Sequence, residues 1–321
     1  MQSKVCITGY TGQIGSYLCD YYLQNNYLVF GLKRSGLSNS KHIDKIYLNK
    51  NFKEIRGDIT NIDLINNFVI SNIPDIFINC AAQSNVNVSF EQPEYTMNAT
   101  GYSVKYCLDA ILKYSVNTKF VTLSSSEMFG DNSHPQDEQT PFNCKSPYAE
   151  AKLFAYNITK EYRNKHDLFA SNAICFNSES PRRSSAYVTK KIVQSAVKIK
   201  LGLQDKLELG NMLSMRDWSH AKDTADAIIK IATADKPDDF VISSGETHSV
   251  KEFVEKVFQS LQLDWKNYVI IDQKLFRPNK ENVYCGNSYK IRSQLNWQPQ
   301  YNFNSLIDDM VSEELKLMEN K

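Results

Sequence analysis

The chain has 321 residues, of which 42% are hydrophobic and 23% are charged, and its formal net charge at pH 7 is +1. This balance is typical of a globular protein, and the length allows one large α/β unit with a smaller lobe. A net charge near zero creates no general attraction for nucleic acid or an anionic membrane, so we expect neither as a partner.

Seven cysteines are scattered along the chain, without a CxxC pair or nearby histidines that would complete a metal site. Such an odd, dispersed set is typical of reduced thiols, not of a disulfide framework or a zinc site. Gly9, Gly12 and Gly15 interrupt the first apolar run, so we expect neither a signal peptide nor a membrane span there. The sequence therefore predicts a soluble, cytoplasmic protein without a bound metal.

Short apolar runs alternate with longer amphipathic stretches through the first half of the chain. We expect buried strands at Val5–Thr8, Leu28–Leu32, Phe52–Ile55, Ile76–Cys80, Phe120–Leu123 and Phe169–Cys175. Helical periodicity falls between them, at about Gly12–Gln24, Ile62–Ser71, Ala99–Tyr114 and Tyr148–Lys165. This β-α-β order predicts an α/β fold of the Rossmann type with a doubly wound parallel sheet.

The pattern changes after Asn177. Two segments have the composition of loops, Glu179–Ser185 and Gly210–His220. A helix at Ala221–Ala234 and a strand at Phe240–Ser243 suggest a return to the main sheet. The other segments predict a smaller α+β lobe and are Val188–Leu201, Lys206–Leu209, Val250–Leu261, Tyr268–Ile271, Arg277–Gly286 and Phe303–Leu317.

The first strand runs directly into the sequence TGYTGQIG at Thr8–Gly15. Glycines allow a tight turn there and let backbone N–H groups approach a pyrophosphate at a helix N-terminus. A plain glycine turn is the alternative, but the position between a strand and an amphipathic helix predicts a dinucleotide site. The fourth strand ends in small residues, Ala81 and Ala82, which let a dinucleotide lie against it.

The end of the second strand bears on which dinucleotide binds. An NAD site usually has Asp or Glu at this point, whereas this chain has Lys33 and Arg34. A basic pair suits a 2′-phosphate and therefore favours NADP. The alternatives are that NAD binds instead, or that the two basic side chains are merely solvated. Asp58, after the third strand, is a candidate for the adenine edge.

Tyr148 and Lys152 form a YxxxK pair, whose side chains share one face of a helix. A phenol with an ordinary pKa of about 10 is a poor base at neutral pH, but a nearby ammonium and a nicotinamide cation favour its phenolate. Ser125 and Glu127 follow the fifth strand, at the sheet edge where ligands bind. A carboxylate facing a sugar there can act as a base beside a ketone and then as an acid toward a leaving hydroxyl. A surface pair and a solvent-facing glutamate are the alternatives.

With these motifs the chain resembles the extended short-chain dehydrogenase/reductase superfamily and, more closely, the GDP-mannose 4,6-dehydratase family. The resemblance runs along most of the chain. Its more specific stretches are FNSESPRR at Phe176–Arg183 and RDWSHAKD at Arg216–Asp223, beside SSSEMFG at Ser124–Gly130 and SPYAEAKLFAY at Ser146–Tyr156.

The resemblance implies a catalytic set of Ser125, Glu127, Tyr148 and Lys152. Tyr148 takes the C4 hydroxyl proton while hydride passes to the nicotinamide, and Glu127 removes the C5 proton and helps expel the C6 hydroxyl as water. Hydride then returns to C6, so the cofactor emerges unchanged and is expected to stay tightly bound. The product is a 4-keto-6-deoxy sugar.

The motifs and the resemblance together assign two further sets of contacts. The expected cofactor contacts are Gly9, Thr11, Gly12, Gln13, Ile14, Gly15, Arg34, Asp58, Ile59, Ala81, Ala82, Tyr148 and Lys152. The expected GDP-sugar contacts are Ser84, Ser125, Glu127, Asn177, Val188, Lys191, Arg216 and Arg277. Arginines suit the diphosphate because the guanidinium fork gives two charge-assisted hydrogen bonds.

The resemblance also assigns a function to each of the two predicted lobes. Residues 1–176, completed by about 213–245, are expected to form the NAD(P)-binding Rossmann domain, and residues 177–212 and 246–321 the nucleotide-sugar-binding lobe. The segment Lys33–Lys41 aligns with the family's cofactor loop, which reaches a neighbour's cofactor. The resemblance therefore implies a homo-oligomer, a dimer of dimers.

Three stretches depart from the family pattern, at Met97–Thr100, Ser184–Tyr187 and Asn279–Asn282, where a carboxylate position has become Lys280. They lie where the sugar and nucleotide are expected, so they leave the hexose open between GDP-mannose and GDP-N-acetylglucosamine, with GDP-manno-heptose as an alternative. An epimerase or reductase of the same fold, which needs no C5 base, and a non-catalytic dinucleotide sensor are the competing functions.

Overall fold

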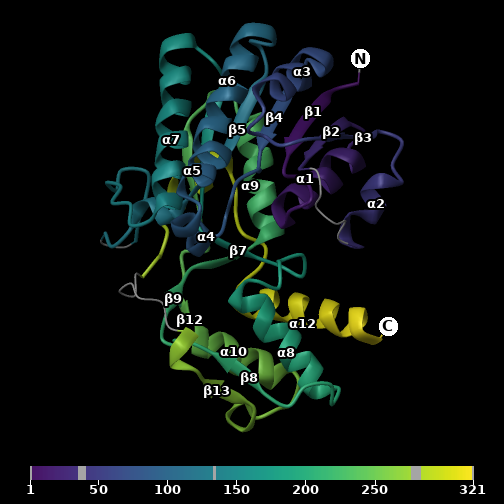
Figure 1. Cartoon of the computed structure of the whole chain (residues 1–321), viewed down its shortest axis with the longest axis vertical. Helices are drawn as coiled ribbons and strands as arrows, with labels where there is room; N and C mark the ends of the chain where they lie inside the picture. Colours follow the sequence, from purple (N-terminus) through teal and green to yellow (C-terminus); the bar gives the residue numbers. More distant parts are fainter. Residues whose placement is uncertain (1, 35–40, 133–134, 276–282, 320–321) are drawn as a thin grey trace.

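The computed structural model of the chain describes residues 2–34, 41–132, 135–275 and 283–319. A larger lobe surrounds a parallel sheet, and a smaller, mostly helical lobe lies beyond the carboxyl ends of its strands (Figure 1). The ends of parallel strands therefore face the junction of the two lobes, which is where such sheets bind ligands.

The central sheet has seven parallel strands and is the predicted Rossmann-type, doubly wound sheet. In spatial order they are β11 (Asp239–Ile242), β6 (Ala170–Cys175), β5 (Lys119–Ser125), β4 (Ile76–Asn79), β1 (Lys4–Thr8), β2 (Leu28–Lys33) and β3 (Phe52–Arg56). The register places Val5 of β1 between Ile76 and Val29. Apart from the edge strand β3, these strands consist mostly of apolar, buried residues, because helices cover both faces. The predicted strands are confirmed to within a few residues, including the return of β11 to the sheet.

Helices pack on both faces of the sheet, each set around its own hydrophobic cluster. The first set is α1 (Gln13–Gln24), α2 (Asp44–Tyr47), α9 (Ala221–Thr233) and α11 (Tyr289–Leu295). The second set is α3 (Ile62–Asn72), α6 (Ser103–Tyr114) and α7 (Pro147–His166). The sequence predicted the long helices but not the short α2 and α11.

After β4 the chain forms α4 (Val86–Glu91), α5 (Pro93–Thr96) and a π-helical stretch, η2 (Met97–Tyr102), before α6 begins. The helix predicted at Ala99–Tyr114 is therefore present, but its first four residues are π-helical and α6 begins at Ser103. Gly101 lets η2 lie against α7, because an added Cβ would come within 3.2 Å of the backbone oxygen of Ala151. This contact holds η2 against the first turns of α7.

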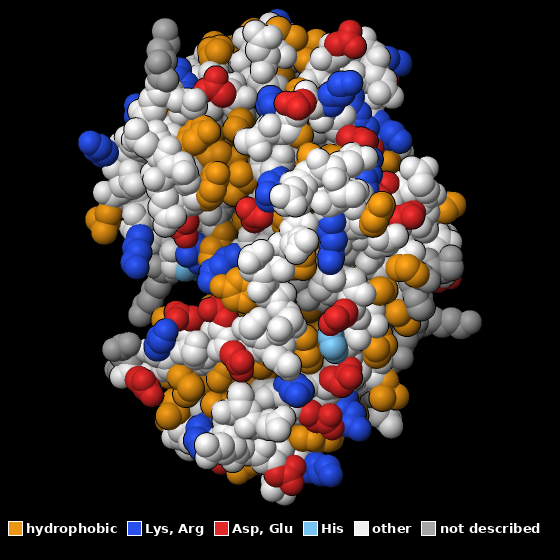
Figure 2. All heavy atoms as spheres, turned by 180° about the vertical axis from the view of Figure 1, so that it is seen from behind, with side chains coloured by type: hydrophobic (Ala, Val, Ile, Leu, Met, Phe, Trp, Pro, Cys, Tyr) orange, Lys and Arg blue, Asp and Glu red, His pale blue; other side chains and the backbone are white. Residues whose placement is uncertain are grey.

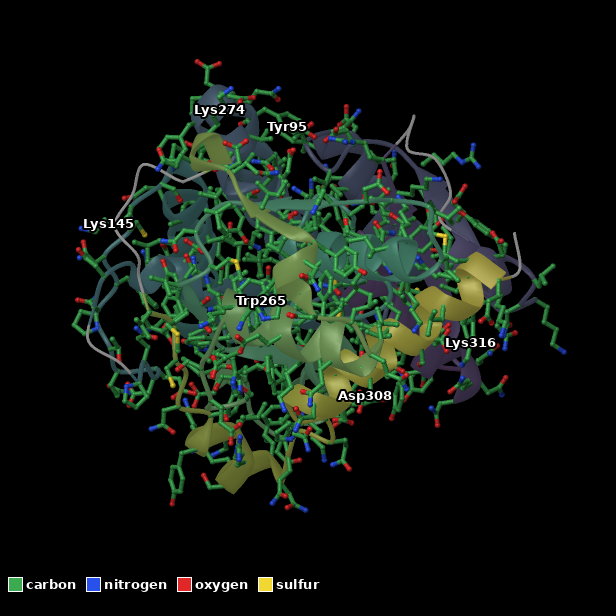
Figure 3. All side chains as sticks on the ribbon, turned by 90° about the horizontal axis from the view of Figure 1, so that it is seen from below. Tyr95, Lys145, Trp265, Lys274, Asp308 and Lys316 are labelled. Atoms are coloured by element: carbon green, nitrogen blue, oxygen red, sulfur yellow. The ribbon has the colours of Figure 1, made fainter. Side chains whose placement is uncertain are left out.

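The smaller lobe is built from α8 (Val188–Lys200), α10 (Val250–Ser260) and α12 (Phe303–Glu319), with the parallel pair β8 (Leu207–Leu209) and β13 (Val269–Ile271). Figure 3 views it from below, with Asp308 and Lys316 along α12 and Trp265 in the short turn η4 (Trp265–Asn267). A buried ion pair joins Lys190 of α8 to Glu314 of α12 at 2.6 Å.

Two small strand pairs link the lobes. β7 (Asn177–Glu179) pairs with β10 (Trp218–His220), and β9 (Met215–Arg216) pairs with β12 (His248–Ser249). The loops predicted at Glu179–Ser185 and Gly210–His220 are therefore wrong in part. Strands of two or three residues carry no readable alternation, and here they are fixed by partners far away in the sequence.

Charged side chains of both signs are interspersed over the face shown in Figure 2, in keeping with the net charge of +1. All seven cysteines are free. Within the described ranges, no helix has the length and apolar character needed to cross a bilayer.

The turn after β1 gives a test of the fold. Gly9 has a φ of 65°, and an added Cβ would lie 2.8 Å from the backbone nitrogen of Ala81. Gly202, after α8, has a similar φ of 70° but no described atom within 4 Å of an added Cβ. We expect Gly202→Ala to lower the free energy of unfolding by about 1–2 kcal/mol through backbone strain alone.

Gly9→Ala should lower it by about 1–3 kcal/mol more, because overpacking adds to the same strain. Denaturant unfolding of both variants measures the difference. Equal losses in the two variants would mean that the close approach of the turn to Ala81 is not required.

Candidate active site

The glycine turn joins the ends of β1 and β4. Thr8 Oγ1 donates to Asn79 Oδ1 at 2.6 Å and accepts from the backbone N–H of Ala81 at 3.2 Å. An added Cβ at Gly15 would lie 2.5 Å from the carbonyl oxygen of Gly9, so the turn packs closely on α1. Among the described residues no side chain caps α1 at Gly12, and its first turn holds no acidic residue. The positive end of this helix therefore fits a diphosphate.

Gln13 was predicted to contact the cofactor, and its side chain has other partners. It is buried, with Nε2 donating to the carbonyl oxygen of Ser178 at 2.7 Å and Oε1 accepting from Ser180 Oγ at 2.9 Å. The side chain thus ties the turn to β7, which leaves only its backbone for a ligand. Thr11 and Ile14 lie in the same turn and are half-buried.

At the end of β2, the two basic residues have different surroundings. Lys33 belongs to the strand and is buried, whereas Arg34 is exposed and donates to the Tyr95 hydroxyl at 2.7 Å. Tyr95 in turn donates to Asp58 Oδ2 at 3.3 Å. The predicted contacts Arg34 and Asp58 are therefore brought together through Tyr95, with Ile59 buried beside them.

Beyond β4, Ala81 and Ala82 are half-buried, and Ser84 is exposed. The Ser84 hydroxyl lies 3.1 Å from the hydroxyl of Tyr187, which directly precedes α8. The guanidinium of Arg183 lies 3.5 Å from the centre of the Tyr187 ring. Tyr187 therefore connects the larger lobe to the first residues of α8.

The four predicted catalytic residues meet at the carboxyl end of β5. Ser125 ends the strand and caps the 3-10 turn η3 (Ser126–Phe129), where its side chain accepts from the backbone N–H of Glu127 at 3.2 Å. Ser146 caps α7, which starts with Pro147 and so presents Tyr148 in its first turn. The Tyr148 phenol hydrogen-bonds the Ser125 side chain, and Lys152 Nζ lies 6.0 Å from the Tyr148 ring centre.

Burial controls the charges in this cluster. It raises the pKa of the Tyr148 phenol, an effect that the Ser125 hydrogen bond opposes only in part. Burial also lowers the pKa of the Lys152 ammonium to about 8, although the nearby Cys175 and Cys80 thiols oppose this shift. Lys152 Nζ donates to the carbonyl oxygen of Leu123. The phenol is thus neutral as it stands, and a further positive charge beside it would favour the phenolate.

The predicted GDP-sugar contacts lie partly around this cluster. Asn177 Oδ1 is buried and has no hydrogen-bond partner among the described residues, which fits an atom that accepts from a ligand. Arg216 lies on β9, with its guanidinium 5.3 Å from the ring of Tyr284.

The other predicted GDP-sugar contacts have no described contact with the catalytic cluster. Val188 and Lys191 lie in the first turn of α8, where Lys191 Nζ donates to the carbonyl oxygen of Glu208 at 2.7 Å. In the described part of the chain, no hydrogen bond or ion pair joins Lys191 to the catalytic cluster. Arg277, Lys280 and most of the predicted oligomer loop lie outside the described residues.

Three tyrosines were missed by the sequence analysis. Tyr95 joins Arg34 to Asp58, Tyr187 contacts Ser84, and the hydroxyl of Tyr284 donates to Glu127 Oε2 at 3.2 Å. Tyr187 ends one departure from the family pattern and Tyr284 follows another, so the signal was present in the sequence. It could not be interpreted there, because each tyrosine acts on a residue about 40 to 160 positions away.

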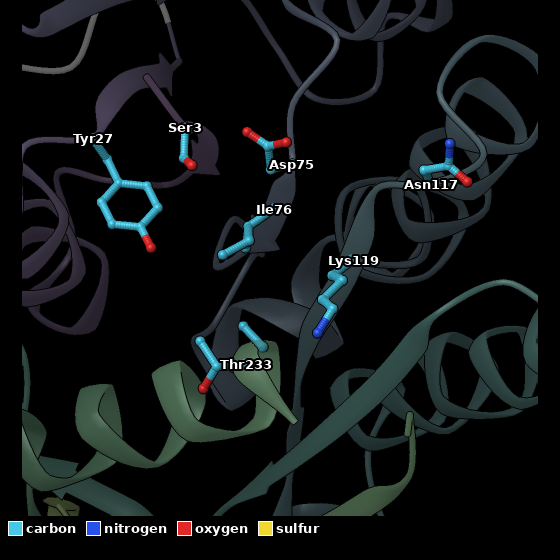
Figure 4. A pocket seen from close by; sticks show the side chains of 8 residues that line it. Ser3, Tyr27, Asp75, Ile76, Asn117, Lys119 and Thr233 are labelled. Carbon is cyan, nitrogen blue, oxygen red and sulfur yellow. The ribbon is translucent and has the colours of Figure 1, made fainter. Parts of the chain in front are cut away.

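A hollow lies at the opposite, amino-terminal end of the strands (Figure 4). Its two charged side chains already have partners within the fold. Asp75 accepts from the backbone N–H of Lys4 at 2.7 Å, and Lys119 Nζ donates to the carbonyl oxygen of Ala234 at 2.8 Å. The candidate active site is therefore the cluster at the carboxyl ends.

The buried ammonium predicts a pH effect on stability. The pKa of Lys152 is about 8 in the fold and 10.5 in the unfolded chain, so the unfolded chain binds more protons between these values. Lys152 therefore destabilises the fold most below pH 8. We expect the stability advantage of Lys152→Met over wild type to fall by about 3 kcal/mol as the pH rises from 8 to 10.5.

Denaturant unfolding across this pH range measures the change. Lys160→Met, on the same helix where the side chain is only partly buried, serves as the control. A difference between Lys152→Met and wild type that does not vary with pH would contradict the effect of burial on this ammonium.

Comparison with known proteins gives the family. The sequence profile described as "GDP-mannose 4,6 dehydratase" matches residues 6–310. The chain is 41% identical to GDP-mannose 4,6 dehydratase 2 of Arabidopsis thaliana, over 97% of this chain and 86% of that protein. It is 38% identical to the Homo sapiens GDP-mannose 4,6 dehydratase, over 97% and 91%.

Solved structures share the fold at lower identity. A dTDP-glucose 4,6-dehydratase from Bacillus anthracis, in complex with NAD, has a TM-score of 0.85 at 23% identity and covers 99% of this chain and 98% of its own. RMD from Pseudomonas aeruginosa, complexed with NADPH, has a TM-score of 0.82 at 18% identity and covers 98% and 100%. Given the profile match and the identity to curated relatives along nearly its whole length, the chain belongs to the GDP-mannose 4,6 dehydratase family.

Proposed function

We propose that the protein is a GDP-sugar 4,6-dehydratase, which converts a GDP-hexose to its 4-keto-6-deoxy form. The observation that carries this proposal is the meeting of Ser125, Glu127, Tyr148 and Lys152 at the end of β5. An epimerase or reductase needs the tyrosine and lysine but no carboxylate base at C5, and the family's relatives do not favour that alternative.

The residues fit a nicotinamide dinucleotide. The turn at residues 9–15 offers an uncapped helix end for the diphosphate, and Tyr148 and Lys152 lie on α7, next to the carboxyl end of β5. When bound, this cofactor accepts a hydride from the sugar and returns it. The exposed Arg34 beside Tyr95 and Asp58 supports NADP as the cofactor, with NAD as the alternative.

The side chains then divide the proton transfers. Tyr148 takes the proton of the C4 hydroxyl, aided by the positive charge of Lys152 and oriented by Ser125. The C4 ketone acidifies C5, where Glu127 removes the proton. Glu127 then gives this proton to the C6 hydroxyl, which leaves as water.

The substrate is proposed to be a GDP-hexose, either GDP-mannose or GDP-N-acetylglucosamine. Asn177 and Arg216 lie beside the cluster and support a nucleotide-sugar there. A panel of GDP-, UDP- and dTDP-hexoses followed by mass spectrometry tests the proposal through the loss of water. Activity confined to a non-GDP sugar would contradict it. The tetramer and the cytoplasmic location stay predictions.

Glu127→Gln separates elimination from oxidation. We expect loss of water release by about 10²- to 10⁴-fold, because the amide cannot take the C5 proton. Oxidation at C4 should remain, visible as the near-ultraviolet absorbance of the reduced nicotinamide. Glu150→Gln, an exposed carboxylate on the first turn of α7, is the control. Full dehydration by Glu127→Gln would show that another group is the base.

Arg34→Ala tests the cofactor preference. Removing a charge-assisted hydrogen bond of about 1.5–3 kcal/mol should weaken NADP binding by about tenfold or more and leave NAD binding unchanged. Fluorescence titration with both dinucleotides measures the ratio. Arg56→Ala, an exposed arginine at the end of β3, is the control. Equal weakening of both dinucleotides would show that Arg34 does not contact a 2′-phosphate.

A further inference from the structure

Tyr284 is held against the proposed base. Its hydroxyl donates to Glu127 Oε2 at 3.2 Å, and its side chain is only 2% exposed. The ring belongs to a buried cluster that includes Phe129, Phe176 and Tyr156. The phenol therefore reaches Glu127 from the side of the protein core.

The backbone around Tyr284 is held from one side by Gln136. The backbone N–H of Gln136 donates to the carbonyl oxygen of Cys285 at 2.7 Å, and its own carbonyl oxygen accepts from Asn287 at 2.8 Å. The side chain of Gln136 also accepts from the backbone N–H of Cys285 at 3.2 Å. Gln136 is fully buried, so these bonds are shielded from water.

Asp217 holds the same segment from the other side. This buried carboxylate accepts from the backbone N–H of Gly286 at 3.1 Å, of Gly245 at 3.0 Å and of Ser244 at 2.8 Å. Gly286 cannot carry a side chain, since an added Cβ would lie 2.6 Å from Ser243 Oγ and 2.7 Å from the ring of Phe176. Gln136 and Asp217 together therefore fix the backbone that directly follows Tyr284.

Tyr284 also lies beside a proposed substrate contact. A backbone bridge pairs Tyr284 with Arg216, whose guanidinium lies 5.3 Å from the tyrosine ring. Arg216 is the proposed diphosphate contact, and Glu127 is the proposed base. One tyrosine thus contacts the base with its hydroxyl and the arginine with its ring.

We propose that Tyr284 is a positioning residue for the elimination step, whose hydroxyl holds Glu127 Oε2 so that the other carboxylate oxygen faces C5 of the sugar. This inference rests on the proposed dehydratase function. A hydrogen bond from a buried phenol restricts rotation of the carboxylate, so it fixes which oxygen points away from Tyr284. In the step itself, the C5–H bond breaks with its proton going to Glu127, the electron pair forms the C5–C6 double bond, and the C6–O bond breaks. Glu127 returns the proton to the departing hydroxyl as water, and Tyr284 keeps its own.

Tyr284→Phe tests the inference, because it removes the hydroxyl and keeps the buried ring. The matched control is Tyr156→Phe, the same change in the same aromatic cluster, where the hydroxyl hydrogen-bonds Asp239 instead. Both variants are purified as full-length protein, checked by thermal unfolding, and assayed with GDP-mannose and with GDP-N-acetylglucosamine. Water release gives kcat and KM, and near-ultraviolet absorbance follows the reduced nicotinamide in a single turnover.

For Tyr284→Phe we expect kcat to fall by about 10- to 100-fold with KM unchanged, as loss of a hydrogen bond to a charged group implies. The reduced nicotinamide should accumulate, because oxidation at C4 does not use Glu127. Tyr156→Phe should match wild type in kcat and show no accumulation.

Two results would overturn the inference: a kcat of Tyr284→Phe equal to that of Tyr156→Phe, or parallel losses of oxidation and water release. Failure of the wild-type protein to release water from either sugar is a separate outcome. It would overturn the proposed function and, with it, this inference.

Discussion

The close approach of the first turn to the end of β4 is the constraint on which the site depends. The order of the sheet reverses between β1 and β4, so the chain leaves these two strands in opposite directions. Gly9 fills the point of contact, where even one added carbon would meet the backbone of Ala81. This leaves the amino end of α1 open toward the junction of the lobes. The cofactor turn and the catalytic cluster of β5 and α7 then face the same space.

The burial of Tyr148 and Lys152 opposes the charged forms that the proposed chemistry needs, the phenolate and the ammonium. It makes the Tyr148 phenol harder to ionise and the Lys152 ammonium easier to deprotonate. Such a pair becomes an effective base only when a ligand adds positive charge beside it. Glu127 is only partly buried and accepts a hydrogen bond from the Tyr284 hydroxyl. The two groups proposed for proton transfer, Tyr148 and Glu127, therefore have different surroundings.

The sequence predicted the features that depend on local patterns. Apolar runs marked the strands of the main sheet, and the YxxxK spacing placed Tyr148 and Lys152 on one helix face. Patterns of two or three residues were not enough for β7 and β10, which exist because they pair with each other across about 40 residues. Lys33 was expected with Arg34 in one basic pair, yet β2 extends far enough to bury it. Tyr284 contacts Glu127 from a segment that Gln136 and Asp217 hold, and both are far away in the sequence, so no local pattern could predict the contact.

Transfer of a labelled hydrogen tests the central claim most directly. GDP-mannose carrying deuterium at C4 is incubated with the protein, and the product is analysed by mass spectrometry and NMR. The account predicts a 4-keto-6-deoxy product in which the deuterium has moved to the C6 methyl group of the same sugar. Deuterium that stays at C4, or a product that retains its C6 oxygen, would contradict dehydration at this site.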